Sequence, residues 1–473
     1  MRLDRAQDSR RLSPDEATLR ADVKLKCLGL SSLERTIARL RSRVRQLSDG
    51  DANTKFFHIL ARGKKRKIII PELVSDGRTA VSHEEMQAMI QEYFGKIFGI
   101  SAVRERSINL AALGLSRLDL SGLEEPFTEE EVLAAIRELP VDRAPGPDGF
   151  TGAFYKAGWG VIKADLLAAL NSFYAGVGRG FHKLNNGLIV LLPKKPDATG
   201  PGDYRPIAMI HSFGKLVSKI LAMRLAPFMQ QLITSNQTAY IRGRSILDSY
   251  KFVHSAAVHL RKRKIPKLLL KLDISKAFDS LAWSFLLEVL QCLGFGNRWR
   301  DWIAILLSSA SSKILLNRCP GEAIRHQRGV RQGDSLSPLL FILAMEVLSR
   351  LFSRAEAAGL LPPLEIPAVR NRCSLYADNV ILFVNPIPSE AQAVKQLLRL
   401  FGDAAGLKIN LHKCSVSPVS CQERERELSA ITDILNCARL LHSRSAGHLS
   451  RAATALQGVA QGLLTNPGRQ GCE

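Results

Sequence analysis

Two aspartates, each at the end of an apolar strand-like stretch, are the residues of this chain best suited to bind a metal ion. Asp273 directly follows the apolar run 267–272, and Asp378 lies between the two apolar halves of the stretch 373–384. Mg²⁺ prefers oxygen ligands and keeps waters or substrate phosphates in the rest of its shell. Two such ions about 3.5–4 Å apart would serve phosphoryl transfer, which needs alignment and charge neutralisation.

Each aspartate also has an ordinary structural explanation. An Asp after a strand is commonly a turn or cap residue. Ala377-Asp378-Asn379 also suits a tight hairpin turn, because Asp and Asn tolerate unusual backbone angles. The metal-site hypothesis is favoured by the combination of two strand-end carboxylates in a very basic chain.

The charge of the chain indicates a polyanionic partner. The chain has 66 Lys and Arg against 44 Asp and Glu, a net charge of +22. The basic residues are spread along the sequence, which favours nucleic acid over the two alternatives, an anionic membrane surface and an unrelated function of a basic protein. The eight cysteines contain no Cys-x-x-Cys pair, which argues against zinc fingers and disulfide scaffolds.

No signal peptide or transmembrane segment is predicted. The polar start, Met1–Arg5, is followed by no apolar stretch, and no run approaches the roughly 18 apolar residues that a membrane span needs. We therefore expect an intracellular protein of the nucleus or cytoplasm that does not enter a membrane.

Helices and short apolar strands alternate along the chain, which indicates an α+β or α/β protein. One helix is expected to begin at the capping pair Thr128 and Glu131, and another to begin near Trp283 and end at Gly294. The remaining expected elements are a basic amphipathic helix within 1–50, a loop over 144–149, helices over 159–175 and 212–233, strands over 187–193 and 267–272, and a helix starting near Ser337.

A series of motifs resembles, in order, the core motifs of reverse transcriptases. The plant non-LTR (LINE-type) retrotransposon branch is the most similar. The motifs extend over roughly residues 49–436, so the resemblance is specific even where each motif is weak. They are Asp51–His58, Ala144–Gly149, Leu192–Lys195 with Tyr204–Ile207, Gln237–Ser245, Leu272–Asp279, Arg328–Pro338, Tyr376–Asp378, and Gly406–Asn410 with Lys413.

The resemblance implies an α+β, right-hand polymerase fold with fingers, an antiparallel palm sheet and a helical N-terminal extension. The implied divisions are a basic helical connector (1–125), a lead-in to the fingers (126–173), the fingers and palm (174–436) and a degenerate tail (437–473). The tail lacks the family's thumb-proximal signature, so the thumb is expected to be missing or incomplete. Neither an endonuclease domain nor a zinc knuckle or RNase H region is seen, which suggests a truncated or degenerate copy.

The resemblance also implies roles for individual residues, each with a plainer alternative. Asp273 and Asp378 would bind two Mg²⁺ ions, and Lys413 would protonate the leaving pyrophosphate. Lys194 and Arg205 would hold the triphosphate; otherwise they are solvated surface charges. Phe278 would crowd a ribose 2′-hydroxyl; otherwise it is a core residue. Gln332 would lie under the incoming base pair, and Gly333 and Tyr376 would lie along the template–primer; Gln332 and Gly333 otherwise form a turn.

One departure bears on activity. The family's hairpin carries two consecutive aspartates, and this chain has Asn379 in the second place. An Asn oxygen can still ligate Mg²⁺, but the site loses one negative charge, which weakens cation capture.

The sequence thus predicts an RNA-directed DNA polymerase (a nucleotidyltransferase) of a LINE-type transposable element, impaired by Asn379. Its partners would be an RNA template, a DNA primer and deoxynucleoside triphosphates. The alternative is a catalytically inactive, nucleic-acid-binding remnant of the same fold. A group II intron maturase shares the core but would need a basic maturase domain, which residues 437–473 do not supply.

Overall fold

The structure is a computed structural model that describes residues 12–42, 69–101, 104, 106–141, 143–176, 180–364, 371–410, 413–421, 425–435 and 439–440. These residues form two compact units. The smaller unit contains the described residues before 83 together with 192–204, and the larger unit contains the others.

The smaller unit holds a long helix and a short hairpin. Helix α2 (Pro14–Ser42) confirms the predicted N-terminal helix over its described length. Residues 43–50, the Asp51–His58 motif and most of the tail 437–473 lie outside the described residues. The hairpin pairs β1 (Leu73–Ser75) with β2 (Arg78–Ala80), and a 3₁₀ turn, η4 (Pro201–Asp203), belongs to the same unit.

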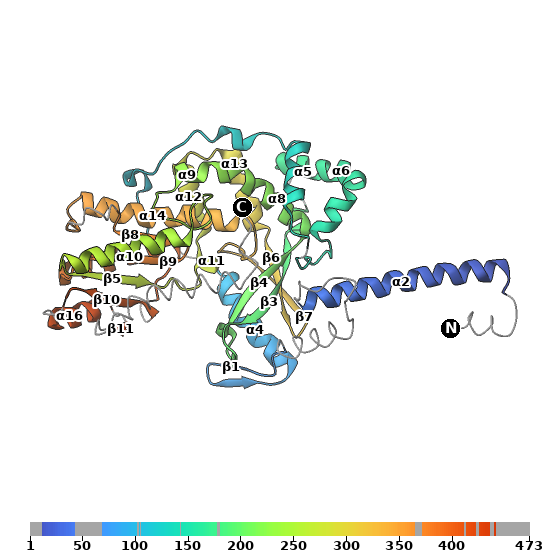
Figure 1. The fold of residues 1–473 in the computed structure, drawn as a ribbon, viewed down its shortest axis with the longest axis horizontal. Helices are drawn as coiled ribbons and strands as arrows, with labels where there is room; N and C mark the ends of the chain where they lie inside the picture. The colour runs from blue at the N-terminus through green and yellow to red at the C-terminus, as the bar shows by residue number, and fades with distance from the viewer. Residues whose placement is uncertain are drawn as a thin grey trace. The chain divides into compact units, whose positions relative to one another are not determined.

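The larger unit alternates helices and strands, as Figure 1 shows. Its strands are β3 (Asn186–Pro193), β4 (Tyr204–Ile210), β5 (Lys267–Leu272), β6 (Ser311–Leu316), β7 (Cys319–Arg325), β8 (Cys373–Tyr376), β9 (Asn379–Val384), β10 (Ser415–Val419) and β11 (Arg439–Leu440). The first residue of β4 and the last two of β3 belong to the smaller unit.

The helices of the larger unit precede, connect and cover these strands. They are α4 (His83–Phe98), η2 (Leu110–Leu113), η3 (Ser121–Glu124), α5 (Glu129–Glu138), α6 (Gly152–Tyr174), α7 (Phe181–Leu184), α8 (Ser212–Leu225), η5 (Ala226–Phe228), α9 (Met229–Leu232), α10 (Ile246–Lys262), α11 (Ala277–Ser280), α12 (Trp283–Leu293), α13 (Asn297–Ser308), α14 (Ser337–Ala357), α15 (Pro388–Ala405) and α16 (Glu425–Leu435).

A five-stranded sheet with the order β11-β10-β5-β9-β8 forms the centre of the larger unit. Strand β5 lies in the middle and pairs antiparallel with both β9 and β10, whereas β10 and β11 run parallel. Alternate side chains face opposite sides, as the pleat requires. Leu269 and Phe383 pack against α10, while Leu270 and Leu382 join the main core with α12 and α14. Both faces of the sheet are therefore buried.

A second sheet has the order β4-β3-β6-β7. Strands β3 and β6 run parallel, and β6 and β7 run antiparallel with a register shift after Lys313. Helix α4 packs against β6 and β7. The predicted α+β class, with mainly antiparallel sheets, is confirmed.

Local signals predicted several element ends correctly. The Thr128 hydroxyl accepts the Glu131 N–H at 3.2 Å at the start of α5, and Gly294 ends α12 with a left-handed φ of 98°. The loop 144–149 and the strand over 187–193 are also present, the latter as β3.

Two helix predictions need correction. Helix α6 begins at Gly152 rather than near 159, because Thr151 caps it by accepting the Phe154 N–H at 3.4 Å. The helix expected over 212–233 is interrupted by η5, which contains Pro227. A proline inside a helix lacks the N–H that the α-helical hydrogen bond needs, so the chain tightens into a 3₁₀ turn there.

Candidate active site

The pairing of β5 with β9 brings Asp273 and Asp378 to the same end of the central sheet. The last paired residues are Leu272 and Val380. Asp273 directly follows Leu272, and Asp378 lies in the turn just before β9. Both aspartates are half-buried. Two carboxylates far apart in the sequence therefore converge on one sheet edge.

Asp378 lies in a two-residue turn whose backbone differs from our expectation. Tyr376 pairs with Asn379, so Ala377 and Asp378 form the loop of the β8–β9 hairpin. The left-handed backbone falls on Ala377, with a φ of 53°, and not on Asp378 or Asn379. A non-glycine residue seldom adopts this conformation, so other contacts must hold it. Tyr376 and Asn379 are both half-buried beside the turn.

Lys413 is brought to the Asp273 end of the sheet by the segment before it. Ile274 and Ile409 form an antiparallel bridge, and the Asn410 N–H donates to the Asp273 carbonyl at 2.8 Å. The Lys413 N–H in turn donates to the Asn410 carbonyl at 3.0 Å. The Lys413 side chain is exposed, as a group that meets a substrate would be.

The segment 328–333 packs on the helix that follows Asp273. The Val330 N–H donates to the Phe278 carbonyl at 2.7 Å, and the Gln332 side-chain amide donates to both oxygens of Asp279, at 3.2 and 3.4 Å. Phe278 is half-buried and stacks on Phe341 with ring centroids 4.5 Å apart. Gln332 thus bonds to Asp279, the residue that follows Phe278, so Phe278 and Gln332 lie close to each other.

Two glycines of this segment are required by geometry. Gly329 has a φ of 78°, and a Cβ there would lie 2.7 Å from the Asp279 backbone. Gly333 has a φ of 104°, and a Cβ would lie 3.1 Å from the Ala208 carbonyl oxygen on β4. Only glycine permits both the left-handed backbone and this close approach.

The proposed triphosphate-binding residues fall in different units. Lys194 belongs to the smaller unit, where its side-chain amine donates to the Gly202 carbonyl at 2.7 Å. Arg205 belongs to the larger unit and lies on β4. Both side chains are exposed.

The donor atoms at the sheet end suit a hard cation. Asp273 and Asp378 supply carboxylate oxygens, and Asn379 supplies an amide oxygen, all of which are ligand types of Mg²⁺. In the described part of the chain, no three His, Cys, Asp or Glu side chains gather in a way that would hold a metal.

Two residues near the site have contacts that our sequence reasoning missed. Asp279 accepts the Gln332 amide, and the Gln237 side-chain oxygen accepts the Ala377 N–H at 3.0 Å. Both residues stand within motifs that we identified. Their partners lie far away in the sequence, so spacing alone carried no signal for these contacts.

Comparison with known proteins gives the chain a family. The model of the family "Reverse transcriptase (RNA-dependent DNA polymerase)" matches residues 192–427. Members of this family bind a nucleic-acid template and nucleotides and use divalent metal ions. The match confirms the predicted polymerase-like fold. None of the helices in the described ranges is both long and apolar enough to cross a membrane.

Two curated relatives are retrotransposon or transposon proteins. The Transposon TX1 uncharacterized 149 kDa protein of Xenopus laevis is 28% identical over 393 residues, which cover 82% of this chain and 30% of that protein. The Retrovirus-related Pol polyprotein from type-2 retrotransposable element R2DM of Drosophila melanogaster is 24% identical over 300 residues, which cover 63% of this chain and 27% of that protein. The chain thus spans less than a third of either relative.

Among solved structures, the RNA-dependent RNA polymerase of a human picobirnavirus aligns with a TM-score of 0.43 and 14% identity, covering 86% of this chain and 69% of that one. The family assignment depends on the sequence matches. Residues 192–427 of this chain therefore belong to a reverse transcriptase domain of the kind found in non-LTR retrotransposons.

Proposed function

We propose that this chain is the RNA-directed DNA polymerase of a plant LINE-type retrotransposon, with fingers and palm over 174–436, a connector over 1–125 and a lead-in over 126–173. Its substrates would be an RNA template, a DNA primer and deoxynucleoside triphosphates. The observation that carries the proposal is the β5–β9 pairing, which sets Asp273 and Asp378 at one sheet end inside the matched family region.

Asp273 and Asp378 would hold two Mg²⁺ ions, with the Asn379 amide oxygen beside them. When bound, the ions would supply alignment of the reacting phosphate and neutralisation of the charge on the leaving group. The nature of the donors supports this assignment, because oxygen ligands from carboxylates and amides are those that Mg²⁺ takes in proteins.

The other residues near the sheet end would bind and orient the substrates. We assign Lys413 to proton donation to the leaving pyrophosphate, which its exposure and its link to Asp273 through Asn410 support. Phe278 would form an aromatic wall beside the sugar, held by its stacking on Phe341. Gln332, Gly333 and Tyr376 would lie under the base pair and the template–primer.

Lys194 and Arg205 would contact the triphosphate. Their exposed side chains support this role, because a phosphate must reach them from solvent. Lys supplies a compact charge and Arg a planar fork that binds two phosphate oxygens.

Asn379 is expected to lower the rate of DNA synthesis strongly. It removes one negative charge from the metal site, and the loss of one group that stabilises transition-state charge typically costs about 100- to 1,000-fold in rate. The test is primer extension on an RNA template with the natural chain and with Asn379→Asp. We expect extension to rise by about 100-fold or more in the variant, since about 2.7 kcal/mol corresponds to that factor.

Two controls define this test. Asp273→Asn introduced into the Asn379→Asp chain should abolish the extension, which would show that the product comes from this site. If the natural chain extends primers as fast as Asn379→Asp, the proposed impairment is wrong.

The absence of a carboxylate at 379 also favours a second function, a nucleic-acid-binding remnant without turnover. This reading predicts RNA binding that weakens steeply with salt, because phosphate contacts release counterions. Fluorescence anisotropy over 50–200 mM salt measures that slope. Salt-dependent binding with no extension by either the natural chain or Asn379→Asp would favour the remnant over the polymerase.

A further inference from the structure

Gln237 contacts the turn that carries Asp378. Its side-chain oxygen accepts the N–H of Ala377 at 3.0 Å and the N–H of Ala239 at 3.0 Å. Gln237 is only 2% exposed. Because both partners are backbone donors, this atom must be the amide oxygen rather than the nitrogen. The side chain thus joins its own segment to the residue just before the proposed metal ligand.

The segment around Gln237 runs along β8, the edge strand of the central sheet. The Leu375 N–H donates to the Asn236 carbonyl at 2.8 Å, and the Thr238 N–H donates to the Leu375 carbonyl at 3.1 Å. Gln237 and Leu375 form a parallel bridge. The Ala377 N–H lies just past the end of β8, beyond these backbone contacts. There the Gln237 side chain supplies the acceptor.

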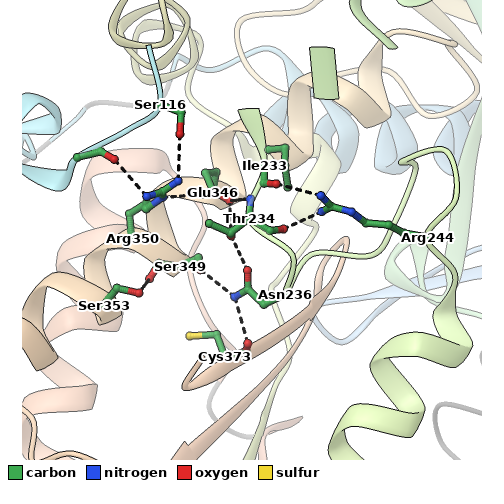
Figure 2. A network of polar contacts seen from close by, with 11 residues as sticks. Ser116, Ile233, Thr234, Asn236, Arg244, Glu346, Ser349, Arg350, Ser353 and Cys373 are labelled. Carbon is green, nitrogen blue, oxygen red and sulfur yellow. Dashed lines mark hydrogen bonds and ion pairs between the residues drawn. The ribbon is translucent and has the colours of Figure 1, made fainter. Parts of the chain in front are cut away.

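Buried and half-buried polar groups hold this segment in place, as Figure 2 shows. Arg244 donates to the carbonyls of Thr234 and Gln237 at 2.7 and 2.8 Å. Glu346 accepts the Thr234 N–H at 3.1 Å and the Arg350 Nε at 2.7 Å. Asn236 donates to the Cys373 carbonyl at 3.1 Å. The backbone of Gln237 is therefore fixed relative to both β8 and α14.

The nitrogen of the Gln237 side-chain amide is buried and, unlike the oxygen, has no hydrogen-bond partner among the described residues. A buried donor without a partner is costly, so one expects a reason for the amide at this place. The oxygen provides one, since a neutral amide accepts two N–H groups without adding a buried negative charge near Asp378.

We propose that Gln237 is a positioning residue that holds the Ala377 peptide in its left-handed turn and thereby fixes the Asp378 carboxylate at the metal site. The inference rests on the proposed function for the role of Asp378. Gln237 does not touch the reacting groups. It acts through one hydrogen bond on a turn whose φ of 53° is unfavourable for alanine.

The first test measures the turn directly, without catalysis. Gln237→Met keeps the size of the side chain and removes the acceptor. In the full chain, hydrogen–deuterium exchange of the Ala377 amide should rise by about tenfold in this variant, the factor expected for one net hydrogen bond. Gln237→Glu keeps an acceptor, so its Ala377 exchange rate should stay within about threefold of the rate in the natural chain.

Thr238→Val is the matched control. It removes the buried hydrogen bond of 2.7 Å between the Thr238 and Ser249 hydroxyls, one residue away from Gln237. This variant should leave Ala377 exchange unchanged. The proposal is overturned if Gln237→Met does not raise Ala377 exchange, or if Thr238→Val raises it equally. Should Gln237→Met fail to fold, Gln237→Leu, which also lacks an acceptor, takes its place, and unchanged Ala377 exchange in that variant overturns the proposal.

The second test measures the consequence for the metal site. Mn²⁺ alone is titrated into each variant and followed by electron paramagnetic resonance. We expect Gln237→Met to weaken Mn²⁺ binding by about tenfold and Thr238→Val to leave it unchanged. Asp378→Asn is the reference variant, which tests whether Asp378 binds the metal at all. If Asp378→Asn leaves Mn²⁺ binding unchanged, the metal assignment of the proposed function fails, whereas unchanged binding in Gln237→Met alone overturns the positioning role.

Discussion

Two regions that flank the proposed site are built around buried groups of opposite charge type. The hairpin seam, residues 234–239 along β8, is anchored by the buried acid Glu346. The Gln332 loop, residues 326–334, contains the buried bases His326 and Arg331. In the seam a carboxylate accepts hydrogen bonds from the Thr234 N–H, the Thr234 hydroxyl and the Arg350 Nε. In the loop a guanidinium donates to Asn185, which lies just before β3.

Because their buried groups differ, acid should change the stability of the two regions in opposite directions. Burial raises the pKa of the Glu346 carboxyl, although hydrogen bonds from Arg350 and Thr234 oppose this. Burial lowers the pKa of His326 to about 3, and the charge of Arg331 adds to that effect. Removing single groups should therefore show which region depends more on its buried charge, and a change of pH should separate the two.

The largest effect is expected for Arg331→Ala. Arg331 is 8% exposed and donates to the Asn185 carbonyl at 3.1 Å and to its side-chain oxygen at 2.5 Å. Asp334 lies 3.9 Å away and would be left without its cation. Removing one member of a buried ion pair should lower the free energy of unfolding by about 3–5 kcal/mol. Urea unfolding at pH 7.5 measures this loss.

Arg325→Ala is the control for that substitution. Arg325 is an exposed arginine at the end of β7, and its removal should change stability by no more than about 0.5 kcal/mol. A loss for Arg331→Ala as small as for Arg325→Ala would mean that the loop does not depend on its buried guanidinium.

Glu346→Ala should have the second-largest effect. It removes the acceptor of the Thr234 N–H, the Thr234 hydroxyl and the Arg350 Nε. The expected loss in the free energy of unfolding is about 1.5–3 kcal/mol, the range for hydrogen bonds to a charged group. It is smaller than for Arg331 because the Arg350 side chain is 24% exposed and can turn to water.

The matched control is Glu322→Ala, which removes an exposed acid on β7. Its unfolding should be close to that of the natural chain. If Glu346→Ala unfolds at the same urea concentration as Glu322→Ala, the seam is held by Arg244 and the backbone contacts rather than by the buried acid.

Local signals explain what the sequence could predict. The strand end at Asp273, the hairpin at 376–379 and the Thr128 cap follow from patterns within a few residues, where hydrophobic alternation and side-chain capping act. These features placed both aspartates on strand ends. The register that brings the two ends together could not be derived from either stretch alone, and it was available only through the family resemblance.

Contacts between distant residues explain what the sequence could not predict. We expected Asp378 or Asn379 to take the unusual backbone angle, because their side chains tolerate it. Ala377 takes it instead, and its N–H is bound by Gln237, 140 residues earlier. A tertiary hydrogen bond here outweighs local turn preference. The same holds for Gln332 and Asp279, whose pairing has no periodic signature.

The smallest expected effect, and the one that separates the regions most cleanly, is the response to acid. His326 is buried and neutral in the folded chain, with its ring 2.9 Å from the Ser312 hydroxyl and stacked on Phe98. The unfolded chain binds a proton below about pH 6.5, whereas the folded chain does not until about pH 3. Stability from His326 is thus present above pH 6.5 and lost as the pH falls.

Between pH 7.5 and 5.5 this loss should be about 1.4 kcal/mol, and it should disappear in His326→Gln.

Glu346 acts in the opposite direction, because its raised pKa makes the folded chain bind a proton more readily than the unfolded chain. Its contribution grows as the pH falls toward 4.5, so Glu346→Gln should make the acid loss steeper. Urea unfolding of the natural chain and both variants at pH 7.5, 5.5 and 4.5 measures how stability changes with pH in each. Equal slopes in all three proteins would mean that neither buried group titrates differently on folding, and the contrast between the seam and the loop would then be one of geometry alone.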